Sequence, residues 1–241
     1  MSELLTINGL TKRFGGLTAV NAVSFSIDRG EVVGLLGPNG SGKTTVMNMI
    51  SGHLSPTGGT IALGKETISG LAANRIALKG VARTFQLVRG LPSLTVAENV
   101  IAALAFGRQK LWGEARTEAL SRLDEVGLAH RADQSAQDLT YIDQKRMELA
   151  RALAAQPELL LLDEWLAGLN PTELKTGIEL IRSIQKRGVT ILLVEHVMDA
   201  IRALCGRCVV MNAGRKIADG PTAEALADRE VINAYLGDAH A

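Results

Sequence analysis

The sequence of 241 residues has few aromatic side chains and almost no net charge. Phe, Trp and Tyr make up 3% of it, too few for the aromatic platform on which proteins stack single-stranded nucleic acid. Lys and Arg number 26 and Asp and Glu 25, for a net charge of +1. A general nucleic-acid binder carries a clear basic excess. We therefore expect no nucleic acid among its partners.

Long hydrophobic runs are also lacking. No apolar stretch approaches the ~20 residues that span a bilayer. Residues 1–5 show neither the basic nor the apolar region of a signal peptide. We expect a cytoplasmic protein, or one held at the cytoplasmic face of the inner (plasma) membrane through a partner.

Cysteine is scarce, and its two copies, Cys205 and Cys208, form a C-x-x-C pattern. A redox pair places its first cysteine at a helix N-terminus, where the thiolate is stabilised. Here the pair follows an expected helix at 197–204 and precedes an apolar strand at 209–211. Zinc needs two further ligands at suitable spacing, and none is evident. We predict two reduced, buried thiols.

What the chain does contain is a complete phosphate-binding loop. The pattern G-x-x-x-x-G-K-[ST] follows an apolar strand at 32–36 and opens an apolar helix at 45–50. Its glycines let successive N–H groups point at an anion, and the helix adds its positive dipole end. Lys43 is placed to neutralise the β- and γ-phosphates of a nucleoside triphosphate, and Thr44 to bind Mg²⁺. The expected nucleotide-contacting residues are Gly37, Pro38, Asn39, Gly40, Ser41, Gly42, Lys43, Thr44 and Thr45.

A second apolar strand, 159–162, ends in two carboxylates, Asp163 and Glu164. It places both acids at the carboxyl edge of the sheet, where ligands bind in open α/β sheets. Asp163 can hold Mg²⁺ directly or through water. Glu164 projects toward the place of an attacking water, and we expect it to be the general base. Alone, the pair also fits a solvated acidic strand end.

Two more polar residues follow expected strands. The amide of Gln86, just before a helical region, can bind Mg²⁺ and orient water. His196 follows the strand at 189–194, where its imidazole can bond to a γ-phosphate. Taken singly, each also fits a plainer role, Gln86 as a surface amide and His196 as a structural residue.

The remaining pattern predicts an α/β protein of one domain. Alternation at 5–8 and 22–28 indicates antiparallel strands with one wet face, whereas the fully apolar strands indicate a parallel sheet covered on both faces. Helical patterns fill 94–128 and 137–155. This region separates the phosphate loop from the acidic pair, so we expect a helical subdomain inserted in the core.

In order and approximate spacing, the phosphate loop, Gln86, the acidic pair and His196 resemble the ATP-binding subunits of ABC transporters. Residues 139–146 (LTYIDQKR) stand where the signature of that family stands, and 167–171 resemble the loop after its catalytic glutamate. The resemblance covers nearly the whole chain. It implies a P-loop NTPase (RecA-like) core with an N-terminal antiparallel β-subdomain. It also implies one nucleotide-binding domain over residues 1–241, with the helical subdomain at about 88–156.

The resemblance further implies ATP and Mg²⁺ as cofactors and assigns roles to residues. Glu164, His196 and Gln86 would be catalytic, and the metal would be held by Thr44, Gln86 and Asp163. Phe14 resembles the aromatic that stacks on adenine, although by itself it also fits core packing. Thr140, in the signature, would contact ATP held by a second subunit.

The same family implies an assembly. Two ATPase subunits close head to tail around two ATP molecules, and the signature helix of each caps the γ-phosphate bound by the other. Closure drives two transmembrane permease subunits through contacts near Gln86 and the helical insert, and hydrolysis reopens the pair. A periplasmic or extracellular substrate-binding protein takes part indirectly.

Four segments resemble the high-affinity branched-chain amino acid importers in particular: 12–16, 80–86, 94–100 and 234–237. The ATPase of lipopolysaccharide export is an alternative, but the tail and the segment around Gln86 favour the importer. Another alternative is a soluble ABC ATPase acting on nucleic acid or ribosomes. Such proteins usually have two cassettes or a long coiled-coil insert, and this sequence shows neither. A P-loop kinase or GTPase leaves the signature segment and His196 unexplained.

The chain departs from the family pattern at four places. Thr140 replaces serine but keeps a hydroxyl, and Tyr141 replaces the first glycine, as it does in many of these importers. Ile142 replaces the second glycine of the signature, and Trp165 replaces the proline after the catalytic glutamate. Glycine permits close backbone approach and positive φ, and a β-branched residue resists both. Our hypothesis is therefore an asymmetric heterodimer in which the signature of this chain serves the partner's ATP weakly.

Overall fold

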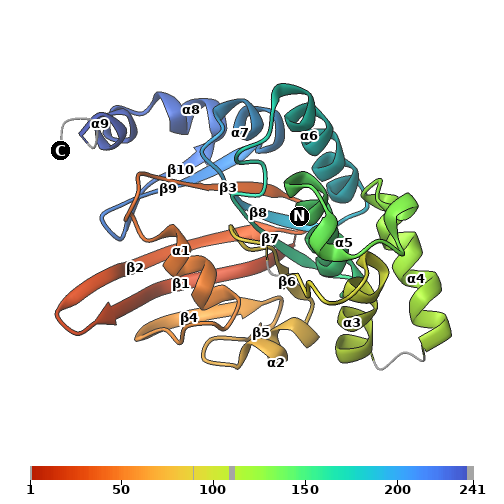
Figure 1. The fold of residues 1–241 in the computed structure, drawn as a ribbon. Helices are drawn as coiled ribbons and strands as arrows, with labels where there is room; N and C mark the ends of the chain where they lie inside the picture. The colour runs from red at the N-terminus through yellow and green to blue at the C-terminus, as the bar shows by residue number, and fades with distance from the viewer. Residues whose placement is uncertain (1, 89, 109–111, 238–241) are drawn as a thin grey trace.

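The computed structural model describes residues 2–88, 90–108 and 112–237 (Figure 1). Within the predicted helical insert, residues 89 and 109–111 lie outside this description. The elements in chain order are β1 (Glu3–Phe14), β2 (Leu17–Asp28), β3 (Val32–Leu36), α1 (Lys43–Ile50), β4 (Gly58–Leu63), β5 (Glu66–Thr67), α2 (Ala73–Leu78), β6 (Val81–Arg83), α3 (Val96–Arg108), α4 (Trp112–Glu125), η1 (Ala129–Arg131), η2 (Ala136–Asp138), α5 (Tyr141–Ala154), β7 (Leu159–Asp163), α6 (Pro171–Lys186), β8 (Thr190–Val194), α7 (Met198–Leu204), β9 (Arg207–Asn212), β10 (Arg215–Pro221), α8 (Thr222–Ala227) and α9 (Arg229–Gly237).

The central sheet has the strand order β10-β9-β3-β8-β7-β6. Its neighbours pair in parallel except β10, which is antiparallel to β9. Every residue of β3, β7 and β8 is buried, as their unbroken apolar sequences predict. Because parallel strands run in one direction, the residues that follow β3, β8, β7 and β6 meet along a single edge.

A second sheet, in the order β2-β1-β4-β5, is antiparallel and covers one face of the central sheet. The long strands β1 and β2 alternate between buried and more exposed positions, which confirms the prediction of one wet face. Helix α1 lies between the two sheets, and its apolar side chains share one core with both (Figure 1).

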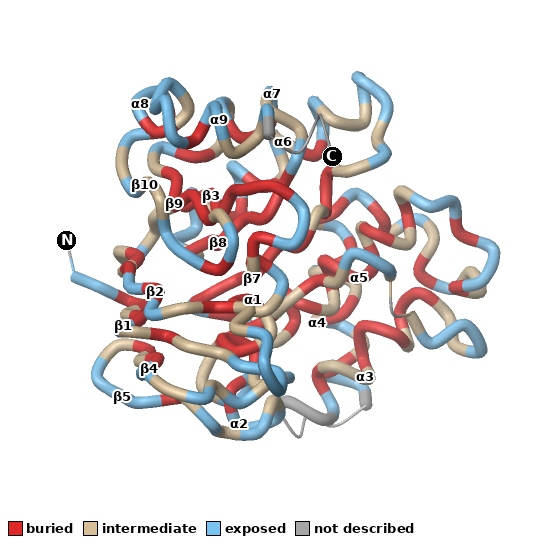
Figure 2. Tube along the Cα trace, turned by 90° about the vertical axis from the view of Figure 1, so that its left-hand side faces the viewer, coloured by how far each residue is buried: buried red, intermediate tan, exposed pale blue. Residues whose placement is uncertain are grey.

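Helices cover the opposite face of the central sheet and share a second core with it. In Figure 2 the buried tube runs through the central strands, and exposed stretches lie on the outer helices and loops. Helices α3, α4 and α5 pack against one another beside the sheet. The predicted helix at 137–155 is wrong at its start, because Thr140 is the N-cap and the helix begins at Tyr141.

The two cysteines lie in the core that the helices share with the central sheet. Cys205 and Cys208 are free and buried, and Cys205 lies at the C-terminal end of α7, which confirms a pair of structural thiols. Within the described ranges, none of the helices combines the length and the apolar character that crossing a bilayer requires.

Two helical glycines provide a matched test of packing beside the turn that follows β7. A Cβ added at Gly177 in α6 would lie 2.6 Å from Leu166 Cδ2 and 3.3 Å from the ring of Trp165, whereas one at Gly113 in α4 meets no described atom within 4 Å. Alanine gains up to ~1 kcal/mol of helix propensity at either site, but overpacking costs roughly 1–3 kcal/mol.

We therefore expect Gly177→Ala to lower the free energy of unfolding by about 1 kcal/mol and Gly113→Ala to raise it by roughly 0.5 kcal/mol. Urea unfolding of both variants measures the difference. Equal stabilisation by the two substitutions would contradict the close packing seen at α6.

Candidate functional site

The residues predicted from the sequence to act together gather at the carboxyl edge of the central sheet. The phosphate loop follows β3, His196 follows β8, the acidic pair ends β7, and Gln86 follows β6. One cavity of about 170 Å³ is lined by residues 39–45 of the phosphate loop, Ala19, His196 and, from the acidic pair, Glu164. The phosphate loop, Glu164 and His196 are far apart in the sequence, and they share a site because β3, β7 and β8 lie side by side in one sheet.

The phosphate loop has a backbone that only glycine accommodates at two positions. Gly37 has φ 141°, and a Cβ there would lie 2.0 Å from the carbonyl oxygen of Met211. Gly42 has φ 105°, and a Cβ there would lie 2.6 Å from the carbonyl oxygen of Ala19. Backbone carbonyls of β9 and β2 therefore pack against the loop, and a residue with a Cβ at either position would force the loop out of this conformation.

Polar groups inside the loop suit an anion. Lys43 Nζ donates to the carbonyl oxygens of Gly37 at 2.7 Å and Pro38 at 2.8 Å, so the ammonium lies within the curl. Burial lowers the pKa of Lys43, and the charges of Glu164 and Asp163 partly oppose this. The buried Ser41 hydroxyl has no hydrogen-bond partner among the described residues. A phosphate would supply acceptors to both groups, so the loop fits the triphosphate that its sequence predicts.

The C-terminal helix contributes to the loop through a contact that the sequence analysis did not anticipate. The Gly37 N–H donates to Tyr235 Oη at 2.8 Å, and Tyr235 belongs to α9. Burial raises the pKa of Tyr235, so its hydroxyl stays protonated at neutral pH. Segment 234–237 was noted only as part of a family resemblance, because no local pattern links a residue to a loop 198 positions away.

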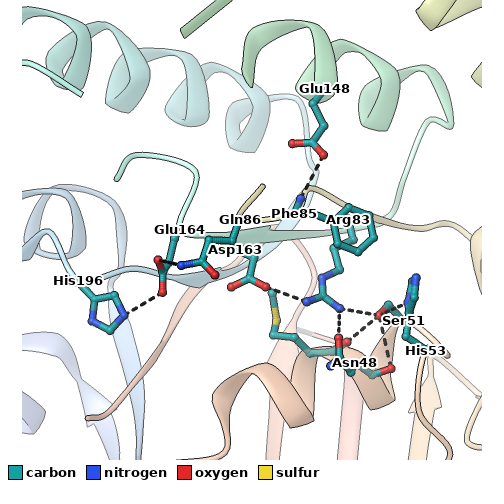
Figure 3. A network of polar contacts seen from close by, with 11 residues as sticks. Asn48, Ser51, His53, Arg83, Phe85, Gln86, Glu148, Asp163, Glu164 and His196 are labelled. Carbon is teal, nitrogen blue, oxygen red and sulfur yellow. Dashed lines mark hydrogen bonds and ion pairs between the residues drawn. The ribbon is translucent and has the colours of Figure 1, made fainter. Parts of the chain in front are cut away.

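In Figure 3 the Glu164 carboxylate lies between the side chains of Gln86 and His196. Its Oε2 accepts a hydrogen bond from Gln86 Nε2 at 2.6 Å, and its Oε1 lies 3.0 Å from His196 Nε2. The three residues predicted to be catalytic thus meet on one carboxylate, although each comes from a different strand end. Glu164 has φ 50°, a left-handed conformation that is unusual for a side chain with a Cβ.

Asp163 has a buried partner that the sequence analysis missed. Its Oδ2 accepts from Arg83 Nη2 at 2.7 Å, and both side chains are less than a tenth exposed, at 7% and 6%. Arg83 also donates to Asn48 Oδ1 at 2.6 Å and to Ser51 Oγ at 3.0 Å, both near the end of α1 (Figure 3). The available signal was that Arg83 ends β6, the strand beside the one that ends in Asp163.

The site offers a few oxygen donors rather than a complete set of protein ligands, and this suits Mg²⁺. Among the described residues, no group of three or more His, Cys, Asp or Glu side chains is arranged to hold a metal ion. Asp163, Thr44 and Gln86 offer hard oxygen ligands at the phosphate loop, and Mg²⁺ usually completes its shell with water and phosphate oxygens. The donor set fits an ion that arrives with a nucleotide.

Phe14 and Thr140 lie outside this network. Phe14 ends β1 and is 45% exposed, with Lys12 Nζ 5.1 Å from its ring centroid, so it is not a core residue. Thr140 caps α5, where its Oγ1 donates to Asp143 Oδ2 at 2.9 Å. It does not line the phosphate-loop cavity of its own chain. The sequence predicted that it serves a second subunit.

Two of the departures from the family pattern are neighbours in space. Ile142 and Trp165 line one cavity of about 370 Å³ between α5 and α6. Ile142 lies in the first turn of α5 and does not need the positive φ that a signature glycine would permit. One of the two reasons for expecting a weak signature therefore does not apply.

Glu195, just before His196, is buried behind the site with 1% of its surface exposed. Its Oε1 accepts from the Leu166 N–H at 2.6 Å. Burial raises the pKa of this carboxyl from 4.5 to about 7, against the backbone N–H bonds from Leu166 and His196 and the charge of Lys145. Glu195 therefore titrates near neutrality in the folded protein.

This shift predicts that stability falls as the pH rises. Between pH 4.5 and about 7 the folded state keeps the Glu195 proton and the unfolded state loses it. The contribution to the free energy of unfolding is complete below pH 4.5 and is lost as the pH passes 7. Glu195→Gln mimics the protonated form, so we expect it to exceed wild type at pH 8 by up to roughly 3 kcal/mol.

Urea unfolding between pH 5 and pH 8 measures this difference, with the exposed Glu179→Gln variant as control. We expect the gap between Glu195→Gln and wild type to close toward pH 5. A gap that stays constant over that range, or one that matches the control, would contradict the raised pKa.

Two models of known protein families match parts of this chain. The family model described as ABC transporter matches residues 20–167. A second one, described as branched-chain amino acid ATP-binding cassette transporter, matches residues 215–241, the segment that includes Tyr235. Together these matches include the phosphate loop, the acidic pair and the C-terminal helix.

Relatives and solved structures match along almost the whole chain. The high-affinity branched-chain amino acid transport ATP-binding protein LivG of Salmonella typhimurium is 45% identical over 98% of both chains. The lipopolysaccharide export system ATP-binding protein LptB of Escherichia coli is 34% identical over 97% of both. The ADP conformation of the cassette MJ1267 has a TM-score of 0.88 at 28% identity, covering 98% of this chain and 100% of that one.

A dimeric post-hydrolysis structure of the cassette MJ0796, bound to ADP and Pi, has a TM-score of 0.82 at 26% identity and covers 90% of this chain and 98% of that one. All these proteins are ATP-binding cassettes, and the similarity is higher to LivG than to LptB. The chain therefore belongs to the ABC transporter family, in the branch of the branched-chain amino acid transport ATP-binding proteins.

Proposed function

We propose that this chain binds and hydrolyses ATP to power an ABC importer for branched-chain or related amino acids. The observation that carries the proposal is the meeting of Gln86 and His196 on the Glu164 carboxylate beside a formed phosphate loop. The cargo assignment rests on LivG, which is more similar than the lipopolysaccharide-export relative. The importer is therefore favoured over the export system.

Hydrolysis follows from the groups at the sheet edge. The loop N–H groups and Lys43 would hold the phosphates, and Phe14 would stack on the adenine. Mg²⁺ would be held by Thr44, Asp163 and Gln86 and would neutralise charge on the phosphates.

Glu164 would then take a proton from the attacking water, while His196 contacts the γ-phosphate. The bonds from Gln86 and His196 to Glu164 place the proposed base between a proposed metal ligand and the proposed γ-phosphate contact.

A second ATPase subunit would complete each site. Thr140 and the N-terminus of α5 lie outside the chain's own phosphate-loop cavity, as expected if they cap a γ-phosphate held by another subunit. The dimeric MJ0796 structure supports such pairing. Of a homodimer and a heterodimer, Ile142 favours the asymmetric heterodimer, because a β-branched residue resists the close backbone approach that the signature glycine permits.

Permease subunits would dock at a groove of about 510 Å³ between α2, the segment after β6, and helices α3 and α5. Arg83 and Phe85 line this groove, and Leu87 and Leu91 nearby are exposed. Arg83 also donates a hydrogen bond to Asp163, so a residue that lines the groove contacts one of the proposed metal ligands. In this proposal residues 88–156 form the helical subdomain, and the chain is peripheral on the cytoplasmic face of the membrane, with an external binding protein delivering cargo.

The general-base assignment predicts the behaviour of Glu164→Gln. The amide keeps the size and polarity of the side chain but cannot take a proton, so ATP binding should persist. Steady-state turnover should fall by roughly 10²–10⁴-fold. Phosphate release and the affinity for a fluorescent ATP analogue measure the two properties separately. Full residual turnover would contradict the role of Glu164.

The transport assignment predicts partners. A tagged chain purified from membranes in mild detergent should carry two hydrophobic membrane subunits, and Leu87→Glu should weaken this association because it places a charge beside the groove. Leu17→Glu, at an exposed leucine of the β1–β2 hairpin, which does not line the groove, is the control. Recovery of the chain with nucleic acid or ribosomes instead would favour the soluble ABC ATPase.

A further inference from the structure

The most deeply buried lysine of the described chain, Lys145, lies in α5 with 1% of its surface exposed. A buried ammonium is tolerated only when its donors are paired. The function proposed above gives it no role, because it is not among the residues that line the phosphate-loop cavity. Its contacts therefore point to another use.

All three N–H donors of the ammonium have an acceptor in the turn after β7. Lys145 Nζ donates to the carbonyl oxygens of Glu164 at 3.2 Å, Trp165 at 2.9 Å and Ala167 at 2.8 Å. In return, Trp165 Nε1 donates to the Lys145 carbonyl oxygen at 3.1 Å. An ammonium has three donors and no acceptor, so the number of carbonyls matches the number of N–H groups.

The turn needs such support. Glu164 has φ 50°, which L-residues with a side chain adopt only when the surroundings impose it. The N–H side of the turn is held by Val194 O, which accepts from the Glu164 N–H at 2.8 Å, and by Glu195 Oε1, which accepts from the Leu166 N–H at 2.6 Å. Lys145 holds the carbonyl side.

We propose that Lys145 is a positioning residue for hydrolysis, which fixes the turn at residues 164–167 so that the Glu164 carboxylate faces Gln86, His196 and the phosphate loop. The inference rests on the proposed function, since it assumes that Glu164 acts on water. Lys145 lies five residues after Thr140 on the same helix, so the helix whose N-terminus serves a partner's nucleotide also holds the chain's own Glu164 in place.

The test grades the number of donors at position 145 in the full-length chain, assembled with its partner ATPase and permease subunits. Lysine has three N–H donors, Lys145→Gln has two, and Lys145→Met has none at similar length. We expect kcat to fall roughly 10- to 100-fold in Lys145→Met and less in Lys145→Gln, because a displaced catalytic group slows the chemical step. The Kd for a fluorescent ATP analogue should stay within about threefold of wild type. Lys175→Met, at an exposed lysine of α6, is the control and should behave as wild type.

A comparison of wild type with Glu164→Gln comes first. If wild type shows no turnover that depends on Glu164, the proposed function fails rather than the role of Lys145. If that turnover is present and both Lys145 variants keep wild-type kcat, the positioning role is overturned. A parallel loss of ATP affinity and kcat, or loss of cooperative folding in both variants, would also overturn it in favour of a purely structural lysine. If only Lys145→Met fails to fold, the kcat of Lys145→Gln decides.

Discussion

The shared carboxyl edge of four neighbouring strands is the constraint on which the rest of this structure depends. In the order β3, β8, β7, β6, the strands deliver the phosphate loop, His196, the acidic pair and Gln86 to adjacent positions. Their full burial makes the sheet rigid, and the two cores on either side leave little freedom for the strands to shift. Groups that must meet on one reacting centre can therefore sit on separate segments of the chain.

Charge at that edge is balanced by pairs that would change when ligands bind. Arg83 compensates Asp163 in a nearly dry environment, and Lys43 lies between the backbone carbonyls of its own loop and two carboxylates. Separating a buried ion pair is costly unless each charge finds a new partner. A metal ion with a polyphosphate supplies both, since the cation can pair with a carboxylate and the phosphates with a cationic side chain. Arg83 also lines the groove proposed for the permease, so this groove is in direct contact with Asp163, one of the proposed metal ligands.

The turn after β7 is held by two segments that are distant from each other in the sequence. Its backbone is held by Lys145 from α5 and by Glu195 from the end of β8, and it carries Glu164. Trp165 fills the space beside α6 and returns a hydrogen bond to α5. Trp165 stands where the family pattern has proline, which has no side-chain donor and could not make this bond.

The sequence by itself determined the chemistry and the fold class. The phosphate loop, the acidic pair, Gln86 and His196 were found because glycine spacing and apolar strands ending in polar residues are local patterns, and local patterns survive in one dimension. The start of α5 was misplaced because helical periodicity cannot show that a threonine caps rather than continues a helix.

Only the tertiary structure decided which distant groups support the site. Arg83 on Asp163, Tyr235 on Gly37 and Lys145 under Glu164 are contacts between segments 80, 198 and 19 positions apart, respectively. Nothing in the neighbouring residues of each marks it as a partner, because a single hydrogen bond between folded segments leaves no periodic trace. Arg83, Tyr235 and Lys145 reach their partners because of strand order and helix packing, which exist only in the folded chain.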